Sequence, residues 1–195
     1  MILIMIAAPF DQLPAAAVAR FTCDAGDILF RADAPADHLI AIDAGQLVLV
    51  RLSPEGNRVM IAQAGPGQTL GEASLFTDRY HYDCVARSPA SGWRIAASAI
   101  RAALVTDPDF ALAMVQTLAR QVRTERLRCE IMSIRSAEAR VLAALRAFGQ
   151  PGTLTAFADS LGLSQEACSR AMAGLVRHGR IERLGRGRYR AIGQG

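Results

Sequence analysis

A run of polar residues between positions 164 and 176 has the types and spacing of a surface that reads nucleic acid. One helical face of this segment is apolar, with spacings of three and four residues: Cys168, Ala171, Met172 and Leu175. The other side carries hydrogen-bonding groups: Ser164, Gln165, Glu166, Ser169 and Arg170. Hydroxyl, amide, carboxylate and guanidinium groups on one helix pair with base edges and phosphates in a DNA groove.

The preceding residues predict how this helix is held. Ser164 is a helix N-cap residue, and the small Ala158, four residues before Gly162, lets two helices approach closely across a short turn. This pattern predicts a helix-turn-helix whose recognition helix runs from Ser164 to about Val176. The alternative is an ordinary pair of antiparallel helices in a helical core.

The segment that follows favours the helix-turn-helix. Apolar residues alternate around a Gly-Arg-Gly-Arg turn at 185–188, as in a small β-hairpin: Ile181, Leu184, Tyr189 and Ile192. A basic hairpin beside a helix-turn-helix is a winged helix. Residues 136–195 carry nine arginines against four acidic residues, a net charge of +5, and the polyanion that this charge fits is DNA.

The N-terminal half has a different pattern. From Phe21 to about Ala97, short apolar runs alternate with turn residues, which is typical of an antiparallel sandwich or barrel. Residues 1–108 carry eight arginines against eleven acidic residues, a net charge of −3. An acidic first half and a basic second half indicate separate roles.

Between the two halves the pattern is helical. Pro108 separates a short helix from a long one at about Asp109 to Arg135. The long helix has an imperfect heptad face: Val115, Leu118, Val122, Glu125, Cys129 and Met132. A second stripe contains Leu127, Ile131 and Ile134, and two apolar faces on one helix predict that one packs against a second copy. The alternative is one wide core stripe. Ser136 then caps a helix over 137–148, which places the domain hinge near Arg135–Ser136.

Other features exclude whole classes of protein. The apolar start, residues 1–8, lacks a basic region and is too short to cross a bilayer, so we expect neither a signal peptide nor an anchor. The four cysteines are scattered without zinc-ligand spacing, which favours the reducing cytoplasm. His38, His81 and His178 stand near no recognisable nucleophile or phosphate loop, so we do not expect an enzyme.

The order of these segments resembles the CRP/FNR superfamily of bacterial transcription regulators over nearly the whole chain. Glycines of its β-roll have counterparts in Gly26, Gly45, Gly56, Gly67 and Gly71. Gly71-Glu72-x-x-Leu75-Phe76 is similar to its cyclic-nucleotide phosphate cassette, and residues 164–170 to its recognition signature. The resemblance implies an α+β chain with three parts: an N-terminal antiparallel, jelly-roll-like β-roll at 1–108, a long dimerisation helix at 109–135 and a C-terminal winged helix-turn-helix at 136–195.

The resemblance also assigns DNA contacts. Glu166 would accept from a cytosine amino group, Arg170 would reach guanine or a phosphate, and Ser169 would bind a phosphate. Gln165 departs from the arginine that is frequent in the family, and an amide pairs best with adenine, so an altered half-site is expected. Arg186 and Arg188 of the wing would contact phosphates. The implied partners are an inverted repeat of double-stranded DNA, a second copy of the chain, and RNA polymerase, with no membrane.

The sensor half departs further from the family. In relatives that bind a cyclic nucleotide, an arginine followed by serine or threonine comes eight to ten residues after the cassette and pairs with the phosphate. Here Tyr82 and Asp83 stand at those positions, before Cys84, and an aspartate repels a phosphate. On the long helix, Glu125 and Arg126 replace the hydroxyl residues that would meet the base. We therefore predict weak or no binding of cyclic AMP at the expected pocket: Gly71, Glu72, Tyr82, Asp83, Cys84, Glu125 and Arg126.

Two alternatives to this interpretation stay open. His81 and Cys84 lie near the segment from which a haem-binding relative takes an iron ligand, so a regulator that senses haem or another small ligand is one of them. The ordinary roles of an exposed strand histidine and a buried cysteine are commoner. The second alternative is a cyclic-nucleotide-domain module that acts through protein partners. The effector itself is not identified by the sequence.

Overall fold

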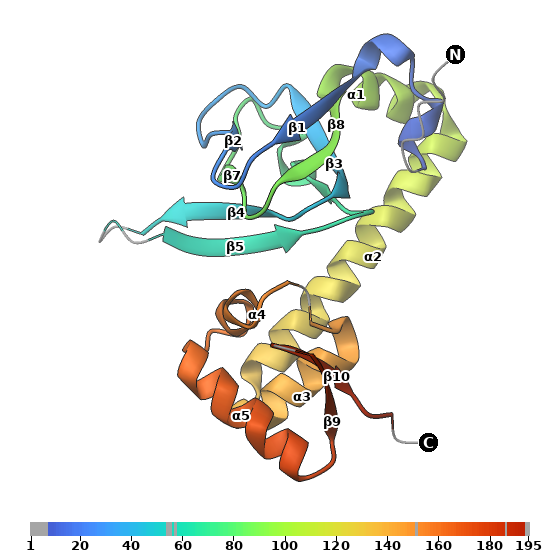
Figure 1. Cartoon of the computed structure of the whole chain (residues 1–195). Helices are drawn as coiled ribbons and strands as arrows, with labels where there is room; N and C mark the ends of the chain where they lie inside the picture. Colours follow the sequence, from blue (N-terminus) through green and yellow to red (C-terminus); the bar gives the residue numbers. More distant parts are fainter. Residues whose placement is uncertain (1–7, 54–55, 57, 151, 186, 194–195) are drawn as a thin grey trace. The chain divides into compact units, whose positions relative to one another are not determined.

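The computed structural model describes residues 8–53, 56, 58–150, 152–185 and 187–193 (Figure 1). The apolar start at residues 1–8, predicted to be neither signal nor anchor, lies outside these residues except for Ala8. Backbone contacts divide the chain into two compact units, unit 1 at residues 1–116 and unit 2 at residues 117–195. Within the described part of the chain, no helix is long and apolar enough to span a membrane.

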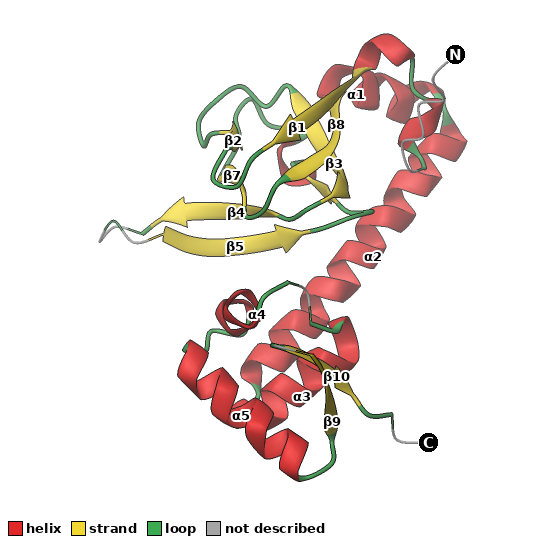
Figure 2. Cartoon of the chain, viewed as in Figure 1, coloured by secondary structure: helices red, strands yellow, loops and turns green. Residues whose placement is uncertain are grey.

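Unit 1 contains two antiparallel sheets, as the spacing of turn residues predicts (Figure 2). The first has the strand order β1 (Val18–Cys23), β8 (Ala90–Ala96), β3 (His38–Ala44) and β6 (Thr69–Leu70). The second has the order β2 (Ile28–Phe30), β7 (Asp83–Ala86), β4 (Leu47–Leu52) and β5 (Arg58–Ala64). Short 3₁₀ turns complete the unit: η1 (Phe10–Gln12), η2 (Ala15–Ala17) and η3 (Glu72–Ser74). The predicted antiparallel β-roll is confirmed.

Strand β3 is buried on both faces because the roll has two apolar layers. Ile40 and Ile42 belong to the interior cluster, with side chains from both sheets. On the outer face of the sheet, helix α1 (Ala97–Thr106) packs against β3 and β8 and buries Ile100. Trp93 on β8 is also buried, and the Arg20 guanidinium lies 5.2 Å from the centre of its ring. Alternation along the strands therefore places one set of side chains in each layer.

Two glycines permit close approaches of the backbone in this roll. A Cβ on Gly92 would lie 2.0 Å from the carbonyl oxygen of Ala41 on the neighbouring strand β3. Gly45 has φ +85°, and a Cβ there would lie 2.3 Å from the carbonyl oxygen of Pro89. Neither position accommodates a larger residue without movement of the backbone.

Helix α2 (Pro108–Ser133) begins at a capped turn and ends two residues before the expected Arg135. The Asp107 carboxylate accepts hydrogen bonds of 3.0 Å from the backbone N–H groups of Asp109 and Phe110. Phe110 and Met114 are buried in unit 1, whereas Ile131 belongs to the core of unit 2. Residues 134–136 are not helical and separate α2 from the next helix.

Unit 2 is a winged helix-turn-helix. Its elements are α3 (Ala137–Phe148), α4 (Leu154–Ser160), α5 (Gln165–Arg177), β9 (Ile181–Gly185) and β10 (Arg188–Ala191). Ser136, Thr153 and Ser164 cap the three helices through their side-chain oxygens, so both N-caps expected from the sequence, Ser136 and Ser164, are confirmed. Phe157, Ala158 and Met172 lie at the centre of the core, each with at most 2% of its surface exposed. The small side chain of Ala158 allows the close packing of α4 and α5 that its spacing from Gly162 indicates.

Candidate nucleic-acid interface and sensor site

The turn between α4 and α5 is held from both sides. Ser164 Oγ accepts from the N–H of Ala167 at 3.1 Å, and Gly162 takes φ +61° to reverse the chain. From α3, Arg140 donates through Nη1 to the carbonyl of Leu161 at 3.0 Å and through Nε to that of Ile134 at 2.9 Å. Arg140 therefore supports the turn. In the sequence nothing distinguishes it from the other arginines of unit 2.

Helix α5 has the two faces that its sequence predicts. The apolar residues Cys168, Ala171, Met172 and Leu175 are all buried. On the opposite side Ser164, Gln165, Glu166 and Arg170 are exposed and Ser169 is half-buried. Glu166 and Arg170 pair with one another across one helical turn. Burial also raises the pKa of the Cys168 thiol to about 11, which keeps it neutral in the core.

Gln165 has a partner that sequence reasoning missed. The hydroxyl of Thr155, on α4, donates to Oε1 of Gln165 at 3.2 Å. With its oxygen held on the side of α4, the amide has its two N–H donors available to another group. The ten-residue separation of Thr155 and Gln165 gave no helical-spacing signal.

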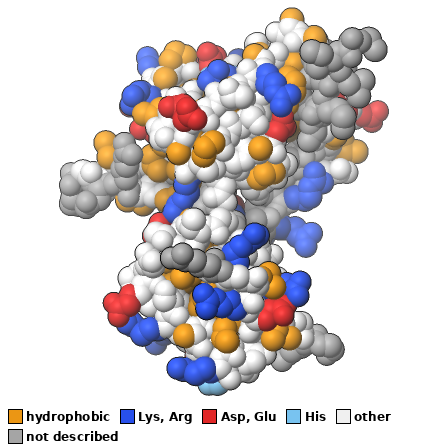
Figure 3. Space-filling model, viewed as in Figure 1, with side chains coloured by type: hydrophobic (Ala, Val, Ile, Leu, Met, Phe, Trp, Pro, Cys, Tyr) orange, Lys and Arg blue, Asp and Glu red, His pale blue; other side chains and the backbone are white. Residues whose placement is uncertain are grey.

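The basic side chains of the wing differ in their exposure and in their partners. Arg188 is exposed, whereas Arg190 is paired with Glu182 across the hairpin. Arg186 lies outside the described residues, so its predicted role is untested. Leu184 and Ile192 are also exposed, and only Ile181 of the four alternating apolar residues is fully buried. On the face that Figure 3 shows, described basic side chains of unit 2 lie among acidic ones.

The predicted seam on α2 is partly open to solvent. Val115, Val122, Cys129 and Met132 are exposed in this chain and Leu118 is half-buried. Leu112 and Leu127 add further exposed apolar surface to α2. Exposed valine and leucine side chains along one helix are typical of a surface that another helix covers.

The cassette in unit 1 forms a left-handed turn and a short 3₁₀ helix. Gly71 has φ +103° and precedes η3, which begins at Glu72. The Glu72 carboxylate accepts a hydrogen bond from the Thr69 hydroxyl. Ser74, which is buried, bonds through Oγ to Nδ1 of His81 at 3.1 Å. His81 is thus an exposed residue with a partner inside the cassette.

Tyr82 and Asp83 both have partners within unit 1. The Arg51 guanidinium, from β4, lies 5.0 Å from the centre of the Tyr82 ring. Asp83 Oδ1 accepts from the backbone N–H of Ala32 at 2.7 Å. Sequence reasoning treated Asp83 only as a repulsive charge, but the structure gives it a structural role on the loop after β2. Arg51 was missed because strands β5 and β6 separate it from Tyr82 in the sequence.

Aliphatic and aromatic side chains, together with the Cys84 thiol, fill the interior of the roll. Phe30 and Tyr80 stack at 3.8 Å between ring centres, and Tyr80 donates to the carbonyl of His38 at 2.6 Å. Burial raises the pKa of Tyr80 to about 12, and burial likewise raises the pKa of the fully enclosed Cys84 thiol to about 12.

Glu125 and Arg126 are exposed on the part of α2 that belongs to unit 2, where Glu125 pairs with Arg128. The part of the chain that the structure describes has no cluster of three or more metal-ligating residues.

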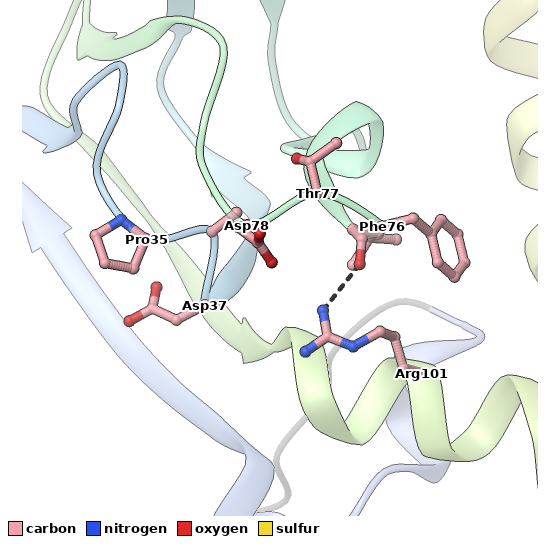
Figure 4. Close-up of a pocket in the computed structure, with 8 residues that line it drawn as sticks. Pro35, Asp37, Phe76, Thr77, Asp78 and Arg101 are labelled. Carbon is pink, nitrogen blue, oxygen red and sulfur yellow. Dashed lines mark hydrogen bonds between the residues drawn. The ribbon is translucent and has the colours of Figure 1, made fainter.

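An open groove of about 530 Å³ lies on the outside of the cassette, beside α1. Figure 4 shows Pro35, Asp37 and Asp78 on one side of it and Arg101 reaching from α1 toward the loop after η3. Arg101 Nη1 donates to the carbonyl of Leu75 at 2.8 Å and so ties α1 to the cassette. Phe76, at the rim, is three-quarters exposed. This groove is separate from the predicted pocket, with which it shares no residue.

The fold and these surfaces define a class of protein: a nucleotide-binding-type β-roll, a long helix and a winged helix-turn-helix in one chain. Residues 20–107 match the family model of the cyclic nucleotide-binding domain. The solved structures that the chain resembles over most of its length include a transcriptional regulator of the CRP family, and the chain has the fold of that regulator.

Three of these structures show the extent of the likeness. FixK2 from Bradyrhizobium japonicum is 20% identical with a TM-score of 0.77, covering 90% of this chain and 93% of its own. A CRP-family transcriptional regulator from Thermus thermophilus is 21% identical with a TM-score of 0.65, covering 90% and 92%. The c-di-GMP-responsive regulator CLP from Xanthomonas campestris is 16% identical with a TM-score of 0.67, covering 92% and 96%. No curated protein sequence matches the chain.

Proposed function

We propose that this chain is a homodimeric, sequence-specific DNA-binding transcription regulator of the CRP/FNR type. The observation that carries the proposal is the face of α5, where Gln165, Glu166 and Arg170 are exposed on a helix whose other side is buried. A capped recognition helix with this face and an adjacent basic wing suits a DNA major groove and its flanking phosphates. In this proposal the protein acts in the bacterial cytoplasm, contacts RNA polymerase and catalyses no reaction.

The exposed apolar side chains of α2 support the dimer. Val115, Leu118, Val122, Cys129 and Met132 would lie against the same helix of a second copy. Two recognition helices related by a two-fold axis enter successive major grooves about 34 Å apart, so the operator is an inverted repeat. Sedimentation equilibrium tests this part, and a monomer at micromolar concentration would contradict it.

The sensor roll does not bind cyclic AMP in this proposal. The predicted phosphate site offers the carboxylates of Glu72 and Asp83, and Asp83 is bonded to the chain itself. The guanidinium of Arg51 is exposed and faces the Tyr82 ring. Phe30, Tyr80 and Cys84 occupy the interior. These residues do not fit a buried, negatively charged phosphate, which needs a paired cation.

DNA recognition is tested by the double variant Glu166→Ala/Arg170→Ala. An operator is first selected from a random DNA pool with the wild-type protein, and affinities are then measured by a mobility-shift assay at fixed salt. Each lost base contact weakens discrimination by about 1–3 kcal/mol, so we expect specific affinity to fall about 100-fold. Arg177→Ala, on the exposed end of α5, is the matched control. Unchanged operator affinity in the double variant would overturn the assignment of this face.

A further inference from the structure

Gln150, in the loop between α3 and α4, holds the wing through both ends of its side-chain amide. Nε2 donates to the carbonyl of Gly187 at 2.7 Å, and Oε1 accepts from the N–H of Tyr189 at 2.9 Å. The two backbone partners fix the orientation of the amide, because the reversed amide would oppose donor to donor and acceptor to acceptor.

These two hydrogen bonds reproduce the pattern that a neighbouring parallel strand would make. A residue of a parallel strand donates to the carbonyl before its opposite residue and accepts from the N–H after it. The residue between Gly187 and Tyr189 is Arg188, so the Gln150 amide takes the place of a neighbouring strand opposite Arg188. The other edge of β10 pairs with β9, and the register of that ladder shifts between Arg188 and Tyr189. Gln150 therefore holds the backbone where regular pairing is interrupted.

The hydrogen bonds of Gln150 fix the backbone on both sides of Arg188 and so restrain the position of that charged residue. Arg188 is exposed at the start of β10, directly after Gly187. On the same strand, Tyr189 packs against the core of unit 2, so the hairpin is anchored by its side chain and by Gln150. A two-stranded hairpin is only marginally stable by itself, so the amide adds restraint that the ladder lacks.

We propose that Gln150 is a positioning residue of the DNA-binding surface, which holds the wing so that Arg188 meets a phosphate. This inference rests on the proposed function. Gln150 touches no DNA in it and acts through Arg188. Preorganisation of Arg188 lowers the ordering cost that an exposed arginine on a free loop would meet on binding.

Gln150→Met tests the inference, because methionine has a similar length and no charge but makes neither hydrogen bond. Arg188→Ala, the double variant and Arg146→Ala, an exposed arginine of α3, complete the set. Affinity for a selected operator is measured over a salt series. We expect Gln150→Met and Arg188→Ala each to weaken binding about tenfold and to reduce the salt slope by about one, and Arg146→Ala to do neither.

The double variant decides whether the two residues act together. If Gln150 acts through Arg188, the double variant binds no more weakly than Arg188→Ala alone. Additive losses, or a Gln150→Met variant with an unchanged salt slope, would overturn the inference. Hydrogen exchange of the Tyr189 amide separates this failure from that of the proposed function. If the Tyr189 amide exchanges faster in Gln150→Met while the melting temperature stays that of the wild type, Gln150 restrains the wing. If the wild-type protein selects no DNA sequence, both proposals are overturned.

Discussion

The guanidinium of Arg170 pairs with the carboxylate of Glu166 one turn earlier on α5, on the exposed face of the helix. In the proposed complex with DNA, these two groups would exchange this contact for contacts with base edges. The Glu166 carboxylate would also lower the net positive charge that the proposed surface presents to a non-cognate DNA sequence.

Glu166→Gln is therefore expected to act in two directions. Loss of the carboxylate raises affinity for random DNA, because a repulsive charge is removed. Discrimination at the base pair read by position 166 falls about tenfold, since the cytosine amino group loses its charged acceptor. The ratio of operator to random-DNA affinity measures both effects. Glu182→Gln, which removes the same charge from the wing, is expected to leave discrimination unchanged; equal ratios for the two variants would contradict the prediction.

Thr155→Val is expected to change base preference without loss of the fold. The Thr155 hydroxyl holds Gln165 Oε1, so the amide N–H groups face outward as donors. With valine the amide turns freely, and preference for an acceptor-bearing base at that position weakens by about tenfold. Selection from an operator library randomised at each position measures the change. A preference that shifts at several positions, or at none, would count against this role.

Wild-type protein is expected to give no binding heat with cyclic AMP at micromolar concentration. Glu72 and Asp83 would place carboxylates at the proposed phosphate site, and desolvation of an unpaired charge costs several kcal/mol. Isothermal titration checks this directly, with Arg51→Ala as the second protein. Micromolar binding that Arg51→Ala abolishes would show that Arg51 serves as the phosphate cation and that the prediction is wrong.

Gly92→Ala is expected to destabilise unit 1 by about 3 kcal/mol or more, because the new Cβ would lie 2.0 Å from a backbone oxygen of β3. Gly65→Ala is the matched control, since its nearest atom would be 3.8 Å away and its φ is not positive. Denaturant unfolding measures both. Equal midpoints for the two variants would show that β3 and β8 are further apart than described.

The thiols are expected to react in the order of their exposure. Cys23, which is half-buried in unit 1 and outside the proposed dimer interface, reacts with a thiol reagent in the native protein, whereas Cys84 and Cys168 react only on unfolding, since both are buried. Burial raises the pKa of Cys84 from 9.0 to about 12, so the neutral thiol contributes stability that is fully present below about pH 9. That stability is lost as pH rises toward 12. A rapid native reaction of Cys84 would contradict the packed interior.

Periodicity predicted the elements well because burial and spacing are coupled. The Cys168–Leu175 stripe, the caps Ser136 and Ser164 and the turn-separated strands all depend on neighbours within a few residues. Side-chain partners far apart in the sequence were not predictable. Asp83 with Ala32, Arg140 with Leu161 and Gln150 with the wing each depend on how distant segments meet. The positions of several site residues therefore depend on partners that the sequence does not indicate.

Trp93, buried on β8 beneath the Arg20 guanidinium, is the chain's single tryptophan, and it belongs to unit 1. Tyr189 is the tyrosine of unit 2. Fluorescence excited selectively in the Trp93 indole therefore reports on unit 1 and does not respond to local changes in the wing. A change in that emission when DNA is added would be a label-free optical record of communication from the recognition helix to the sensor.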